Sequence, residues 1–255
     1  MQYKKLLLIG GGIVSGGGLF LSNLRSILVN NTDISKTRDE HNGNVWDSNW
    51  DKRSNMKPRG TRNIILIRHG QYNYGKTDQE KTLTELGKKQ AVYTGIRLAE
   101  LGLDKKLNVV FESTMTRAHE TSELIYRQLN ADIPIQKTDL LREGCPTFPD
   151  PPFKGGEVSL ERVERDSSRM DESFEYFMHR ADADQDGDSY ELFVCHGNLI
   201  RYFLCKLLQL PTSAMHRWRL RHCSITWVTI RPSGNVSLRL FGDTGHLPSD
   251  KLTFE

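Results

Sequence analysis

The chain has 255 residues, 37% of them hydrophobic, and a formal net charge of +3 at pH 7. This length suffices for one catalytic domain with a sizeable core and leaves residues for appended segments. The charge is only mildly basic and the chain has no long run of Lys and Arg, so nucleic acid is not an expected partner.

The N-terminal part of the chain contains a stretch suited to a membrane. Residues 6–21 (LLLIGGGIVSGGGLFL) carry no charge and follow Lys4-Lys5. As a helix they would span about 24 Å, so a few following residues must help to cross the roughly 30 Å hydrocarbon core. We therefore expect residues 1–29 to form a membrane segment. Positive charge on both sides of it leaves its orientation open.

The same stretch has an alternative interpretation as the strand-turn-helix start of a dinucleotide-binding fold. Gly10 and Gly12 match the first two glycines of that fingerprint, but Ser15 stands where the third is required. Residues 34–60 are polar and irregular, so no further strand-helix units follow to build the sheet. The sequence favours the membrane segment.

Residues 30–61 form an expected linker whose distinctive feature is the motif WDSNWD at residues 46–51. Tryptophan is unusual in a polar tether, because each indole can bury about 150–250 Å². We expect Trp46 and Trp50, with Asp47 and Asp51, to form a docking peptide that joins subunits. The alternative is that both rings fold back on their own domain.

From residue 62 onward, strand patterns alternate with helix patterns. Short apolar runs predict strands at residues 63–67, 109–111, 133–138, 190–195, 224–230 and 236–241. Amphipathic stretches predict helices at about residues 84–101, 115–129, 158–180 and 198–210. This alternation predicts a catalytic domain at residues 62–255 of the α/β class, a three-layer α/β/α sandwich with a mostly parallel central sheet.

The sequence offers weak evidence for a metal site. The four cysteines show no Cys-x-x-Cys spacing. The stretch Asp182-x-Asp184-x-Asp186-Gly187 begins like a calcium loop, but its twelfth position, where Glu is required, is Phe193. We expect an acidic turn there, and neither a metal nor a cofactor.

Two of the apolar strands end in the same dipeptide. His69-Gly70 follows one predicted strand and His196-Gly197 follows another. Open α/β sheets bind ligands at the carboxyl ends of their strands. A single histidine there is more often a hydrogen-bonded structural residue, but Arg68 accompanies the first histidine and a helix start follows the second. Together they predict an anion site.

At these residues the chain resembles the histidine phosphatase (phosphoglycerate-mutase-like) superfamily. The resemblance rests on five motifs in chain order: LIRHGQYN at residues 66–73, LTELG at 83–87, STMTRAHET at 113–121, LRE at 141–143 and CHGN at 195–198. It implies that His69 is a nucleophile that becomes a phosphohistidine. Arg68, Arg117 and His196 would bind the phosphoryl oxygens.

The same resemblance implies roles for three further residues. Glu143 would be the general acid for the leaving oxygen and then the base for the attacking water. The backbone amides of Gly197 and Asn198 would complete the anion cradle. Outside such a motif, Glu143 beside Arg142 would be read as an exposed ion pair.

Within the superfamily the chain is similar to the mitochondrial serine/threonine protein phosphatases. The hydrophobic N-terminus, the WDSNWD motif and the segments LLREG, FPDPP, DSYE and GDTG carry that similarity. It implies phosphoprotein substrates, a mitochondrial membrane location (outer or inner undecided) and homo-oligomers formed through WDSNWD. In a neighbouring subunit, Asp47 and Asp51 would lie near basic groups such as Arg217, Arg219 or Arg221.

Two alternatives stay open. The first is a small-molecule phosphatase or phosphoglycerate mutase. A mutase needs a second cationic subsite for the substrate carboxylate, and residues 144–189 lack the expected Arg-Arg pair. The second is a multimeric scaffold with vestigial catalysis. The intact His69, Glu143 and His196 argue against it.

Overall fold

A computed structural model describes residues 45–152 and 158–254 of the protein. The expected membrane segment, residues 1–29, lies outside the described residues. In the part of the chain that is described, no helix is both long and apolar enough to cross a bilayer. The described residues from Trp46 onward belong to one compact unit, so residues 46–61 are part of the same unit as the strand-helix region.

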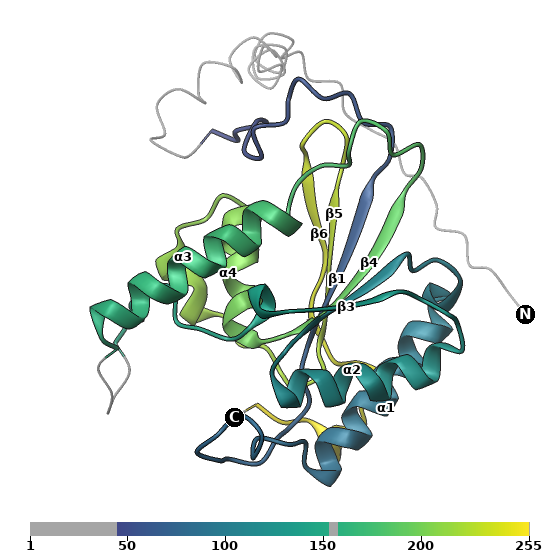
Figure 1. Ribbon diagram of the computed structural model, residues 1–255, viewed down its shortest axis with the longest axis vertical. Helices are drawn as coiled ribbons and strands as arrows, with labels where there is room; N and C mark the ends of the chain where they lie inside the picture. Colours follow the sequence, from purple (N-terminus) through teal and green to yellow (C-terminus); the bar gives the residue numbers. More distant parts are fainter. Residues whose placement is uncertain (1–44, 153–157, 255) are drawn as a thin grey trace, which may run out of the picture. The chain divides into compact units, whose positions relative to one another are not determined.

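A six-stranded sheet forms the centre of this unit (Figure 1). Its strands are β1 (Arg62–Arg68), β2 (Val109–Ser113), β3 (Ile135–Thr138), β4 (Ser189–Cys195), β5 (Ile225–Ile230) and β6 (Val236–Asp243). In space their order is β3-β2-β4-β1-β5-β6. Strands β1 to β4 pair in parallel, whereas β5 is antiparallel to both β1 and β6. The prediction of a mostly parallel α/β sheet is confirmed.

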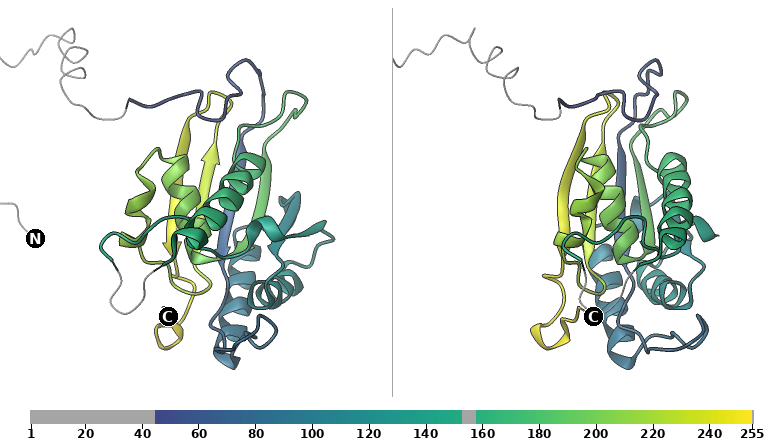
Figure 2. Two further views of the ribbon diagram at one scale, coloured as in Figure 1. Left: turned by 60° about the vertical axis from the view of Figure 1, so that its left-hand side comes forward. Right: turned by 90° about the vertical axis from the view of Figure 1, so that its left-hand side faces the viewer.

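Helices cover both faces of the sheet (Figures 1 and 2). The α-helices are α1 (Glu85–Glu100), α2 (Thr116–Leu129), α3 (Leu160–Phe177) and α4 (Gly197–Leu207). Short 3₁₀ helices lie at Leu103–Lys105, Asp139–Leu141, Thr212–Arg217 and Ser249–Lys251. One core lies between the sheet and α3 and α4, and a second lies between the sheet and α1 and α2.

The central strand β1 supplies both cores. All seven of its residues are buried. Successive side chains point to opposite faces of a strand, so Ile64 and Leu66 enter the α3–α4 core while Ile65 and Ile67 enter the α1–α2 core. A strand covered on both faces reads as a continuous apolar run in the sequence. That run ends at Arg68, where the sheet reaches the candidate site.

The expected cap of the first helix is also confirmed. The Thr84 hydroxyl accepts a hydrogen bond from the amide of Gly87 at 3.0 Å, at the start of α1. Helix α3 is shorter than predicted, because Ser159 caps it from outside and its regular hydrogen bonds end at Phe177. The acidic turn expected at residues 182–187 takes part in surface ion pairs, including Asp182 with Arg53 at 2.6 Å.

The WDSNWD segment packs against its own domain in the described chain. The Trp50 ring lies 5.9 Å from the Phe174 ring, and its Nε1 donates to the carbonyl oxygen of Gly234 at 2.8 Å. The Asp51 carboxylate accepts from Nε and Nη2 of Arg180 at 2.8 and 2.7 Å. Both side chains of this ion pair are almost completely buried, at 1% and 3% exposure. Within one chain, therefore, the motif folds back on the domain that carries it.

Within the described chain the ion-pair partner of Asp51 is Arg180, and the expected contact with Arg217, Arg219 or Arg221 of a neighbouring subunit stays a prediction. Asp51 lies before β1, near the β5–β6 hairpin and the end of α3. Residues 217–221, where the expected arginines lie, follow α4 and precede β5, so they lie near the carboxyl end of β1. Arg180 is therefore the cation within reach of Asp51. Asp47 donates its backbone amide to Gln209 Oε1 at 2.8 Å.

Replacing Asp51 by Asn should leave the Arg180 guanidinium buried without a counter-ion. We expect the free energy of unfolding at pH 7 to fall by about 3–5 kcal/mol, measured by urea denaturation. Burial opposes ionisation of Asp51, but hydrogen bonds from Arg180 and its charge outweigh burial and lower the pKa of this carboxyl. The contribution of the pair is thus present above the unfolded-state pKa and is lost as the pH falls through the folded-state pKa.

Asp182→Asn is the matched control, because the Asp182 side chain is 58% exposed in its pair with Arg53. Loss of this surface pair should cost less than about 1 kcal/mol. Equal losses in the two variants would contradict a structural role for the Asp51–Arg180 pair.

Candidate active site

The two predicted histidines meet at one edge of the sheet. Strands β1 and β4 are parallel neighbours, with Arg68 opposite Cys195 in the register. His69 and His196 follow directly, and their ring centroids lie 5.1 Å apart. Both side chains are buried. The juxtaposition predicted from the two strand ends is therefore present in the structure.

His69 is held as a neutral imidazole whose unprotonated nitrogen is Nε2. Its Nδ1 lies 2.8 Å from the carbonyl oxygen of Gly70, which only accepts, so Nδ1 carries the proton. The opposite nitrogen, Nε2, accepts from Nε of Arg117 at 3.1 Å. Burial, and then the nearby His196, Arg117 and Arg68, hold the pKa of His69 well below its ordinary value. At neutral pH the Nε2 lone pair is available to attack an electrophile.

The two expected arginines flank this imidazole, and both are buried. Arg68 donates from Nη1 to the carbonyl oxygen of Leu220 at 2.5 Å, which fixes its guanidinium beside β1. Arg117 lies over the Tyr72 ring, 4.8 Å from its centroid, and its Nη1 is 3.7 Å from Asp78 Oδ1. Two buried guanidinium groups close to a neutral imidazole form a site suited to a multiply charged anion.

His196 is also neutral, and the Ser113 hydroxyl beside it bears on which ring nitrogen carries the proton. Its Nε2 lies 2.9 Å from the Ser113 hydroxyl, which accepts from the amide of Met115 at 3.2 Å. The Ser113 proton can point at Nε2, an arrangement that places the proton of His196 on Nδ1. That buried Nδ1 has no hydrogen-bond partner among the described residues. Burial and the charges of Arg117 and Arg68 hold the pKa of His196 well below its ordinary value, so it acts as a neutral donor.

The Glu143 carboxylate lies against the first turn of α4. Its Oε2 accepts from the amide of Asn198 at 3.3 Å and its Oε1 accepts from the amide of Gly144 at 3.1 Å. The Arg169 guanidinium binds the carbonyl oxygen of Glu143 at 3.2 Å and so holds this loop against α3. Burial raises the pKa of Glu143 despite these hydrogen bonds. A carboxyl with a raised pKa suits a group that must both give and take a proton.

The amide of Asn198 thus differs from its expected role. This amide was expected to donate to a bound anion. In the structure it donates to the Glu143 carboxylate instead, because the unpaired amides of a helix's first turn attract a carboxylate. The Asn198 side chain also donates to the carbonyl oxygen of Gly144 at 2.7 Å. Asn198 therefore orients the Glu143 loop, while Gly197 lies beside the Arg68 guanidinium.

Close packing supports the loop that follows the nucleophile. The amide of Gly70 donates to Thr121 Oγ1 at 3.0 Å, and the amide of Gln71 donates to Gln90 Oε1 at 2.9 Å. A Cβ at Gly87 would lie 1.9 Å from the carbonyl oxygen of Gln71, so only glycine allows α1 to start this close to the loop. The LTELG and STMTRAHET motifs therefore act by positioning His69 as well as by supplying Arg117.

Sequence reasoning missed His222, a third histidine of the site. Its ring centroid lies 5.6 Å from that of His69, and its Nε2 lies 3.2 Å from Nη2 of Arg68. Its Nδ1 lies 2.8 Å from the hydroxyl of Thr253. No motif marks His222, but it lies just before β5. Because β5 is antiparallel, its start shares the sheet edge with the ends of β1 and β4.

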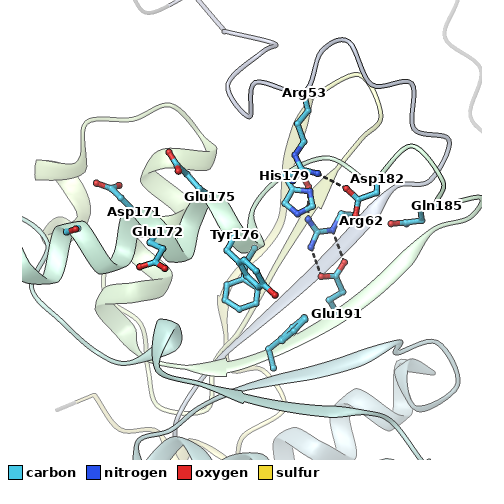
Figure 3. A pocket seen from close by; sticks show the side chains of 13 residues that line it. Arg53, Arg62, Asp171, Glu172, Glu175, Tyr176, His179, Asp182, Gln185 and Glu191 are labelled. Atoms are coloured by element: carbon cyan, nitrogen blue, oxygen red, sulfur yellow. Dashed lines mark hydrogen bonds and ion pairs between the residues drawn. The ribbon is translucent and has the colours of Figure 1, made fainter.

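Two cavities flank the strands at opposite ends. One, of about 300 Å³, is lined by the site residues Arg68 and Gly197, among others. Another, of about 940 Å³, lies around the Arg62–Glu191 ion pair and Tyr176, as Figure 3 shows. The larger cavity contains none of the predicted site residues, because it lies at the amino end of β1.

Comparison with known proteins agrees with this geometry. The model of the histidine phosphatase superfamily (branch 1) matches residues 64–243. The chain belongs to this superfamily. The expected family and the expected enzyme class, a phosphatase, are therefore confirmed.

Similar proteins include a serine/threonine-protein phosphatase PGAM5, mitochondrial, from Rattus norvegicus. It is 45% identical over 234 residues, which cover 82% of this chain and 80% of the relative. The Drosophila mojavensis protein with the same description is 43% identical over 235 residues, covering 82% and 81%. Among solved structures, a phosphoglycerate mutase from Plasmodium falciparum is 32% identical with a TM-score of 0.53, covering 77% of this chain and 99% of its own.

The position of His222 predicts a specific dependence of stability on pH. Burial, Arg68 and Arg117 lower the pKa of His222 to about 3, whereas an unfolded histidine titrates near pH 6.5. Between these values the unfolded state binds more protons, so acid favours unfolding. His222→Asn should shrink the difference in free energy of unfolding between pH 7 and pH 5 by about 2 kcal/mol. An unchanged difference in urea denaturation would contradict this prediction.

Proposed function

We propose that the protein is a serine/threonine protein phosphatase that works through a phosphohistidine on His69. The observation that carries this proposal is the buried, neutral His69, whose unprotonated Nε2 accepts a hydrogen bond from Arg117 and lies in the positive field of Arg68 and Arg117. The descriptions of the similar proteins, which name serine/threonine-protein phosphatases, support the substrate class. No metal or cofactor has a part in this mechanism.

In the first step, Nε2 of His69 attacks phosphorus in line with the bond to the serine or threonine oxygen. As the N–P bond forms and the P–O bond breaks, Glu143 gives its proton to the departing oxygen. Arg68, Arg117 and the Nδ1–H of His196 bind the three equatorial oxygens. Such fixed donors act mainly on the charge of the transition state, and each contributes about 10²–10³ in rate.

In the second step, water replaces the alcohol. Glu143, now a carboxylate, takes a proton from the water as its oxygen attacks the phosphohistidine. The N–P bond breaks, inorganic phosphate leaves, and His69 is again neutral with its proton on Nδ1. The amide of Gly197 is the remaining backbone donor for the anion, while Asn198 holds Glu143 in place.

Two substitutions test the two steps separately. His69→Ala should abolish hydrolysis of a phosphothreonine peptide. Glu143→Gln should lower that rate by about 10²–10⁴. With p-nitrophenyl phosphate, whose leaving group needs no proton, it should release a burst of nitrophenolate and accumulate phosphohistidine at residue 69, detected by mass spectrometry.

The matched control is His119→Ala, since His119 lies on the outer part of α2 and pairs with Glu112; it should keep the parent rate. Residual hydrolysis near that rate in His69→Ala would contradict the nucleophile. Faster turnover of 3-phosphoglycerate or fructose bisphosphate than of the peptide would favour a small-molecule enzyme.

We also propose that the protein is tethered to a mitochondrial membrane by residues 1–29 and forms homo-oligomers through WDSNWD. The names of the similar proteins support the mitochondrial location. For the oligomer, the support is the set of contacts that Trp50 and Asp51 make with Phe174, Arg180 and Gly234, which we call the motif's docking groove. The same groove on a neighbouring subunit would accept it equally well if the segment exchanges between subunits.

Trp46→Ala/Trp50→Ala should therefore reduce the mass seen in sedimentation equilibrium. Ser48→Ala is the control within the motif, because its side chain is exposed and it should leave the mass unchanged. A tryptophan variant that loses stability but sediments at the parent mass would contradict oligomerisation through the motif. The motif would then only stabilise the domain of its own chain.

A further inference from the structure

A second cationic surface adjoins the candidate active site. The cavity of about 300 Å³ that includes Arg68 and Gly197 is also lined by Arg201, Arg219 and Phe254. Three of its lining residues are arginines, and none is Asp or Glu. The phosphoryl site and this cavity share Arg68, so a phosphate bound at His69 has the cavity immediately beside it.

Arg201 is held in a fixed orientation in this cavity. Its Nε donates to the carbonyl oxygen of Gly197 at 3.1 Å, and its Nη1 donates to that of Trp218 at 2.9 Å. Its Nη2 donates to Asn198 Oδ1 at 2.5 Å. These three hydrogen bonds fix the orientation of the Arg201 guanidinium.

Arg219 is the exposed cation of the cavity. Its guanidinium lies 6.0 Å from the Phe254 ring, and no carboxylate of the described chain pairs with it. Arg217, two residues earlier, differs in both respects. It pairs with Asp150 at 2.5 Å and does not line the cavity. Arg219 is therefore available to an anion from outside the chain, and Arg217 is a natural control.

Phe254 shapes the outer wall of the cavity. Besides Arg219, it contacts the guanidinium of Arg221, 4.8 Å from the ring centroid. Stacking on an aromatic ring restrains an arginine while leaving its N–H groups free for a planar acceptor. The cavity thus combines oriented guanidinium groups with an apolar wall, a combination suited to an acidic group on a flexible chain.

We propose that this cavity is a second anion subsite, which recognises an acidic group flanking the phosphorylated serine or threonine of the substrate, with Arg219 as the specificity-determining residue. The acidic group is the carboxylate of Asp or Glu or a second phosphate. This inference rests on the proposed protein phosphatase activity. It explains why the cations extend beyond the two arginines that the phosphoryl group itself needs.

The test compares phosphothreonine peptides that differ only in the flanking residue: Asp, phosphoserine, Ala or Lys. For each, kcat/KM is divided by that for p-nitrophenyl phosphate, which has no flanking group. The parent enzyme should prefer the acidic peptides over the Ala peptide by about fivefold to tenfold, and the Lys peptide should be poorest. The Asp and phosphoserine arms distinguish a carboxylate from a second phosphate as the preferred anion.

Arg219→Gln should abolish the preference, and Arg219→Glu should turn it toward the Lys peptide. That reversal needs a direct charge contact, because loss of a merely structural role would lower kcat/KM for all peptides alike. Arg217→Gln should keep the parent preference. Equal normalised kcat/KM for all peptides would overturn the subsite while leaving the phosphatase proposal standing. Failure to hydrolyse any phosphopeptide, with p-nitrophenyl phosphate still turned over, would overturn the proposed function and the subsite with it.

Discussion

The chemistry of this protein depends on keeping one imidazole uncharged in the midst of cations. In the proposed mechanism His69 must offer a lone pair to phosphorus, while Arg68 and Arg117 lie close enough to bind the same phosphoryl group. These needs are compatible because burial and positive neighbours both disfavour a second proton on the ring. The Gly70 carbonyl oxygen then places the remaining proton on Nδ1, so Nε2 carries no proton. The groups that attract the anion therefore also keep the nucleophile neutral.

Much of the surrounding structure maintains this arrangement. Gly87 brings α1 against the loop after His69, and Thr121 receives the amide of Gly70. On the other side, Arg169 and Asn198 hold the Glu143 loop at the start of α4. The hydrogen bonds to the amide of Gly70 and the carbonyl oxygen of Gly144 also provide partners for backbone groups of buried residues, so the same bonds stabilise the fold and position the site.

Different features lie at the two ends of the strands of the sheet. Its carboxyl edge, with the start of antiparallel β5, carries the catalytic groups and the cationic cavity. The region before β1 carries the WDSNWD segment, held by the buried Asp51–Arg180 pair. We expect the loss of either partner of the buried pair to lower the free energy of unfolding, so the pair holds the segment in one position against the domain.

The sequence by itself determined the strands, the Thr84 cap of α1 and the two histidines of the candidate site. A strand buried on both faces must be a continuous apolar run, and parallel strands must end at one edge, so His69 and His196 could be paired before any coordinates existed. The resemblance to the histidine phosphatase superfamily also pointed to Arg117 and Glu143. Only the tertiary structure decided that His222 joins them, that Asn198 serves Glu143, and that Asp51 meets Arg180. These contacts join residues far apart in the chain, and their geometry depends on how loops fold over the sheet edge, for which no local periodicity exists.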